Sequence, residues 1–351
     1  MSIPSQRKYD KIHALNVQRY GKKIKTYYRK LINEVSGLTY NLSLNPNDEF
    51  YFRNNPKVSK KVDDLIKQLN YDVRGITVDG INTEWGLAVN KNNELAIYAA
   101  GDKLAELPDT YKEKWFTNND KARKAFLARK NKGLGLSDKI WKNSKQVKYE
   151  LELALDVGIK DGRSAANLSR EVRGYLNDPN KLFRKVKDDK GVLRLSKAAK
   201  AYHPGAGKYR SSYKNALRLT SNETNFSYNA SDFEKRKGQE FIVGVRIKTS
   251  PGYTRSVDKG GIVCGDLQGD YPKGFDFTYK WHVNCRCISL NILKTKDELD
   301  NDANRILTGK EPLKRSKNLV NKKPANYTGY IKDNKKKWSN WQNQPRTFEN
   351  N

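Results

Sequence analysis

The chain has 351 residues, of which 36% are hydrophobic, so it can form one large domain or two smaller ones with separate cores. Sixty-nine Lys and Arg outnumber thirty-nine Asp and Glu, and the resulting formal net charge of +30 indicates a polyanionic partner such as nucleic acid. No stretch reaches the roughly 18 apolar residues that span a bilayer, and the charged N-terminus lacks a signal-peptide core, so we expect the protein to begin in a cytoplasm.

The N-terminal region, 1–130, is predicted to be helical. Apolar residues recur at steps of three to five from Tyr9 to Val35, which predicts an amphipathic helix with a basic opposite face. Gly37 is expected to end this helix. The Pro- and Asn-rich segment 43–57 then predicts a loop.

Two further helices are predicted before residue 130. Apolar residues from Val62 to Val73 mark the first, which can continue less regularly toward Trp85. The second covers 95–107, where good helix formers precede Pro108.

The middle region, 131–204, is also predicted to be helical. Ser137 is expected to cap a helix that Gly158 and Gly162 break. A second helix at 164–179 carries apolar residues four apart on one face, and 185–196 has the pattern of a short hairpin.

The third region, 205–294, combines helix and strand patterns. A long helix is predicted at 209–237, and strands with alternating apolar residues are predicted at 241–247 and 288–292. We therefore expect an α+β fold, predominantly α-helical, with a helical N-terminal part and a small antiparallel sheet packed on the long helix. The remaining region, 295–351, is rich in Lys and Asn and is predicted to be a basic extended tail.

The tail and the basic helices leave two interpretations open. Aromatic residues interleaved with the basic ones, as at Tyr327, Tyr330, Trp338 and Trp341, can dock on a partner or stack on single-stranded nucleic acid. The alternative is a solvated basic surface that serves only solubility.

Three cysteines and one histidine lie close together in the sequence, and they are Cys264, His282, Cys285 and Cys287. Three thiolates and one imidazole suit a closed, tetrahedral structural zinc site. The alternatives are buried thiols or a disulfide, and a catalytic Cys–His pair, for which no orienting acid is identifiable. The clustering favours metal ligation.

Four segments around these residues resemble the C-terminal module of the phage Mu F-like head-morphogenesis family, the minor head proteins. They are KYRSSYKNALRLTSNETNFSYNASDFE, VGVRIKTS, VCGDLQGDYPKGFDF and WHVNCRC. The chain departs from the family pattern at Val283, where members have Pro, and at Leu267, where many have a further Cys. The resemblance covers roughly 205–295.

The resemblance implies a virion protein without enzyme activity, located at the portal vertex or in the capsid interior and present in the host cytoplasm during assembly. It implies a role in procapsid assembly and in the retention or delivery of packaged DNA. The expected partners are portal and capsid proteins, and DNA held by nonspecific phosphate contacts.

Two alternatives belong to other functional classes. In some relatives this module is joined to a toxin or an ADP-ribosyltransferase domain, so the chain could be an injected effector enzyme, with Glu223 as the candidate acid. An ion pair with Arg218 on the helix surface, or a polar contact on the packing face, is the simpler role for Glu223. The other alternative is a plain nucleic-acid-binding protein of a mobile element.

Overall fold

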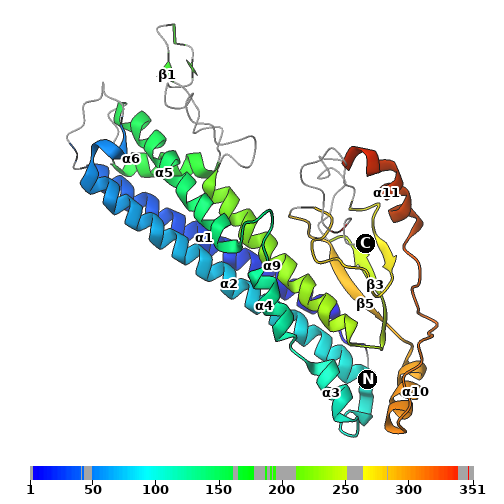
Figure 1. The fold of residues 1–351 in the computed structure, drawn as a ribbon. Helices are drawn as coiled ribbons and strands as arrows, with labels where there is room; N and C mark the ends of the chain where they lie inside the picture. Colours follow the sequence, from blue (N-terminus) through cyan, green and yellow to red (C-terminus); the bar gives the residue numbers. More distant parts are fainter. Residues whose placement is uncertain are drawn as a thin grey trace. The chain divides into compact units, whose positions relative to one another are not determined.

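The computed structural model describes residues 3–40, 42, 50–160, 165–177, 186–187, 190–191, 193–194, 211–250, 264–282, 284–338 and 347. The described residues are mostly helical, and a three-stranded antiparallel sheet lies in the C-terminal part, which confirms the predicted fold class (Figure 1). The chain forms two compact units. The first unit contains Met1–Val17, Gly80–Leu127 and Asn222–Asn351, and the second unit contains Gln18–Asp79 and Ala128–Ser221.

Helix α1 (Gln6–Tyr40) is the predicted amphipathic N-terminal helix. It continues past Gly37, so the prediction that this glycine ends the helix is wrong. Glycine inside a helix costs only about 1 kcal/mol, and the residues just before it, Val35 and Ser36, are buried. Packing of this turn therefore outweighs the local preference.

Helix α2 (Pro56–Ala100) joins residues that the sequence divides into two helices. The short 3-10 turn η1 (Phe52–Asn54) precedes it, and Pro56 occupies its first position, where a missing N–H costs nothing. The apolar pattern is interrupted at Lys91 and Asn92, yet both side chains are buried. Because these buried positions are polar, the spacing of apolar residues does not predict that the helix is continuous.

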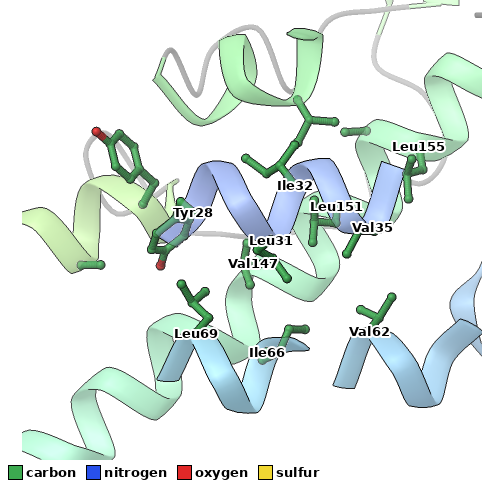
Figure 2. Close-up of a cluster of buried hydrophobic side chains, with 14 of the residues drawn as sticks. Tyr28, Leu31, Ile32, Val35, Val62, Ile66, Leu69, Val147, Leu151 and Leu155 are labelled. Carbon is green, nitrogen blue, oxygen red and sulfur yellow. The ribbon is translucent and has the colours of Figure 1, made fainter. Parts of the chain in front are cut away.

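The core of the second unit lies between α1, α2 and α5 (Leu136–Lys160), with α6 (Ala165–Asn177) beside them. Figure 2 shows apolar side chains of the three longer helices meeting there: Leu31 and Val35 of α1, Val62, Ile66 and Leu69 of α2, and Val147, Leu151 and Leu155 of α5. The predicted hairpin is present as β1 (Val186–Lys187) and β2 (Leu193–Arg194).

The two ends of α5 differ from the prediction. The helix begins at Leu136, because the backbone N–H of Gly135 donates to Oδ2 of Asp138 at 2.8 Å. Ser137 is therefore inside the first turn and is not the cap. At the other end, α5 continues through Gly158 to Lys160, and Gly162 lies outside the described residues.

A buried carboxyl group lies at the start of α9 (Ser212–Lys237). Glu150 of α5 accepts hydrogen bonds from the backbone N–H and the hydroxyl of Ser212, at 2.7 and 2.5 Å. Gln146 donates to the same carboxyl at 2.9 Å. Burial raises the pKa of Glu150 to about 8, although these hydrogen bonds oppose the shift.

We expect the raised pKa of Glu150 to make the protein more stable at pH 5 than at pH 8. The usual pKa of the carboxyl is 4.5, so between that value and about 8 the folded state binds a proton that the unfolded state releases. Stability is therefore lost as the pH rises through this window, by up to about 4 kcal/mol. Urea unfolding of the wild type and of Glu150→Gln at both pH values measures the effect. Identical pH dependence in the two proteins would contradict it.

The sheet of the first unit has the strand order β4-β3-β5, and both pairings are antiparallel. Its strands are β3 (Ile242–Lys248), β4 (Gly269–Tyr271) and β5 (Ile288–Leu293). The predicted strands thus pair, and β4 is an addition from the segment between them. Gly244 of β3 lies against Val320, because a Cβ there would be 2.7 Å from Val320 Cγ2. Only glycine fits this contact without displacement.

A network of buried charges joins α2, α9 and β5 in the first unit. Lys91 Nζ lies 2.7 Å from Asp232 Oδ1, and Arg236 Nη1 lies 3.5 Å from Asp232 Oδ2. Asn92 donates to Asp232 at 2.8 Å, and Arg236 donates to Asn291 Oδ1 at 3.1 Å. Burial alone would raise the pKa of Asp232, but attraction by Lys91 and Arg236 outweighs it and lowers the pKa.

The prediction of an extended tail is wrong for α10 (Lys296–Leu307) and α11 (Ala325–Trp338). Thr295 and Glu298 form a capping box at the start of α10, and apolar residues on one face of that helix, such as Leu299 and Ile306, are buried. A cap and a buried face are sufficient to form a helix despite the polar composition. Trp341 lies outside the described residues.

Candidate metal centre

The four predicted ligands lie on either side of β4 in the first unit. Cys264 begins the turn before β4, and Cys287 directly precedes β5. His282 and Cys285 belong to the connection between these two strands, where the Cys285 backbone N–H donates to the His282 carbonyl at 3.1 Å. Folding of the β4 hairpin against β3 therefore brings Cys264 back to the histidine.

Three of the ligands form a compact group. Cys264 Sγ lies 3.0 Å from His282 Nε2 and 3.8 Å from Cys285 Sγ. The ligand atoms of Cys264, His282 and Cys285 all lie within 4.8 Å of one another. Two zinc–sulfur bonds of about 2.3 Å at a tetrahedral angle place their sulfur atoms about 3.8 Å apart, so the thiol pair fits such an ion.

Cys287 adjoins this group without belonging to its tightest part. Its thiol is buried in the same core and lies close enough to the thiols of Cys264 and Cys285 to shift their pKa values. The three cysteines are free, and 3.8 Å between two Sγ atoms is far longer than the about 2.05 Å of a disulfide. The structure therefore contains the four donors side by side as reduced thiols and an imidazole.

The thiols titrate as a coupled group in which one favours the charged form. Hydrogen bonds from Cys264 and then Cys287 lower the pKa of Cys285 well below its usual value. Contacts with Cys264 and then Cys285, together with burial, raise the pKa of Cys287. A thiolate, and not a thiol, is the form that binds a metal ion, so Cys285 is the donor closest to its ligating state.

Aromatic side chains enclose the cluster. Trp281 is completely buried next to His282, and its ring lies 4.8 Å from that of Phe277 and 6.0 Å from that of Tyr271. Tyr327 of α11 packs against Tyr271 at 5.5 Å, so the predicted tail closes this core. The thiols are buried among these rings and His282 is half-buried, and such apolar surroundings suit a structural centre better than an exchangeable one.

Polar residues that sequence spacing does not identify hold the backbone of the centre. Lys280 donates its ammonium group to the Cys287 carbonyl at 3.0 Å. Asn326 of α11 donates to the carbonyls of Asp266 and of Gln268, the latter at 3.1 Å. Asn326 is about 60 residues from the turn that it supports. In the sequence, Lys280 could be noticed because it lies two residues before His282, whereas nothing in the sequence indicates the contact of Asn326 with this turn.

The arrangement offers little to the catalytic alternatives. Cys264 and His282 are in contact, but the thiol is buried, with 3% of the residue exposed. Glu223 is likewise buried on α9. The surface pockets beside α3 (Asp109–Phe116) and beside α10 are lined by other residues.

No family model, curated protein or solved structure matches this chain.

Proposed function

We propose that this protein is a minor head component of a phage particle, which acts without enzyme activity at the portal vertex or in the capsid interior. Its role would be in procapsid assembly and in the retention or delivery of packaged DNA. Among the described residues, no helix is long and apolar enough to cross a membrane.

The observation that carries the proposal is the assembly of the family-like segments into one module. The part of α9 from Asn222 onward, strand β3, the turn around β4 and the WHVNCRC segment all belong to the first unit. The cysteine and histidine side chains of these segments then converge on one cluster. A chance match of short motifs would not require such convergence.

The net charge supports a role beside packaged DNA. A charge of +30 on 351 residues favours contact with dense phosphate, because each neutralised phosphate releases condensed counterions. Nonspecific binding of this kind needs no base-reading element.

We further propose that the cluster holds one structural zinc ion through Cys264, His282, Cys285 and Cys287. Three thiolates around a divalent cation leave one negative charge, and the ammonium group of Lys280 at the Cys287 carbonyl lies close enough to balance it. The ion would fix the β4 turn to the start of β5. It has no catalytic role here, because four protein donors leave no position for water.

Co-expression with the portal and major capsid proteins of the same phage tests the proposed role. The tagged chain should sediment with portal rings or procapsids at a fixed stoichiometry after nuclease treatment. Sedimentation that disappears with the nuclease would instead support a plain nucleic-acid-binding protein. Consumption of NAD by the purified chain, abolished in Glu223→Gln, would contradict the non-enzymatic role.

A further inference from the structure

The exposed face of α1 in the second unit has an unusually uniform charge. Between residues 18 and 33 the helix contains no Asp or Glu, and all its basic side chains are exposed. These are Arg19, Lys22, Lys23, Lys25, Arg29 and Lys30. We call this set the α1 basic face.

The opposite side of the helix is anchored, which fixes the direction of the basic face. Ile24, Tyr28, Leu31 and Ile32 are each at most 3% exposed and belong to the core of the second unit. Figure 2 shows Tyr28, Leu31 and Ile32 on this helix within that core. With 100° between successive residues, Arg19, Lys22, Lys23, Arg29 and Lys30 lie on the half of the helix away from these four, and Lys25 lies at the edge of that half, about 20° around the helix from Ile32.

Three of the six positive charges on this face lie outside any ion pair among the described residues. Lys30 Nζ lies 3.9 Å from Glu34 in an exposed i,i+4 pair at the end of the face. Lys22, Lys23 and Lys25 have no ion pair to a described residue. Burial raises the pKa of Tyr27, and the nearby carboxylates of Asp72 and Asp79 add to this shift, so these two acidic residues lie on the Tyr27 side of the helix.

We propose that the α1 basic face is the surface through which this protein contacts the phosphate backbone of duplex DNA. The proposal rests on the proposed function, which supplies packaged DNA as the polyanion. Residues 19 to 30 span about 16 Å of helix, and duplex DNA carries one phosphate charge per about 1.7 Å of its axis. A length of about 16 Å therefore faces about nine or ten phosphates, which exceeds the six cations that spread over one half of the helix.

Helix α2 offers a matched control in the same unit. Its exposed Lys60, Lys61, Lys67 and Arg74 are interleaved with acidic residues, and Lys67 pairs with Asp64 at 3.0 Å. A mixed face of this kind has little net attraction for phosphate. Removing four of its charges changes the net charge of the protein as much as removing four from α1.

The test compares two full-length quadruple variants with the wild type in binding a 30-base-pair duplex of random sequence. The first is Lys22→Gln, Lys23→Gln, Lys25→Gln and Arg29→Gln, and the control is Lys60→Gln, Lys61→Gln, Lys67→Gln and Arg74→Gln. We expect the α1 variant to bind at least about 30-fold more weakly at 0.1 M salt. Its slope of log K against log salt should be smaller by about three to four, whereas the control keeps both values near wild type.

Equal losses in the two variants would overturn the proposal, because net charge alone would then explain binding. Wild-type affinity in the α1 variant would overturn it as well. Circular dichroism and thermal melting establish that each variant is folded, which is expected because all eight side chains are exposed. Sedimentation with procapsids should be retained by the α1 variant, so a failure of this surface is distinguishable from a failure of the proposed function.

Discussion

Replacing Asp232 with alanine is expected to destabilise the protein by about 3–5 kcal/mol. The carboxylate lies between Lys91 and Arg236, and all three side chains are at most 2% exposed. Without it, two buried cations lose the carboxylate that both of them contact, and the more distant Asp10 and Asp276 compensate their cost of desolvation only in part. Urea unfolding of the wild type and Asp232→Ala at neutral pH measures the difference.

The ion pair of Arg246 with Asp270 provides the control for this measurement. Its two hydrogen bonds, of 2.6 and 2.7 Å, have excellent geometry, but the side chains are 48% and 37% exposed. Asp270→Ala should therefore cost no more than about 1 kcal/mol. If the two substitutions cost the same, burial is not what gives the Asp232 network its importance.

Replacing Cys285 with alanine is expected to destabilise the first unit by at least about 3 kcal/mol and to remove its response to chelators. Cys285 Sγ lies 3.8 Å from Cys264 Sγ and within 4.8 Å of the His282 ligand atom, and contacts with Cys264 and Cys287 lower the pKa of its thiol. Loss of one donor from a four-donor site lowers metal affinity steeply, and the affinity contributes directly to the free energy of folding. Thermal melting with and without a chelator measures both effects.

Leu267→Ala separates loss of the metal from loss of packing. Leu267 is completely buried in the same core, so its truncation should cost about 2–5 kcal/mol. That variant should still melt at a lower temperature when a chelator is added. A wild type that is insensitive to the chelator would contradict the metal-dependent account.

Much of the fold follows from local patterns in the sequence. The alternating residues at 241–247 and 288–292 indicate strands, and the structure pairs them as β3 and β5. The continuous helix α2 does not follow from such patterns, because Lys91 and Asn92 interrupt its apolar periodicity. Asp232, 140 residues away from Asn92, supplies a buried partner to both of them, and Asn291 supplies another to Asn92. Long-range pairing of polar groups leaves no periodic trace in the sequence.

The candidate centre, too, could be predicted from the sequence only in part. The spacing of Cys264, His282 and Cys285 allows them to share an ion, and the structure brings their ligand atoms together. The support from α11 was not predictable, because the polar composition of 295–351 conceals the buried Tyr327. One buried aromatic residue in a polar segment does not produce the apolar periodicity from which a helix or a strand is predicted.

Quantification of zinc in full-length protein purified without a chelator is the most direct test of the central claim, that this module is built around a structural metal ion. The account predicts one zinc ion per chain in the wild type and none in Cys285→Ala, with Leu267→Ala retaining the ion. Wild-type protein that is folded, contains no metal and binds none when zinc is added would contradict it.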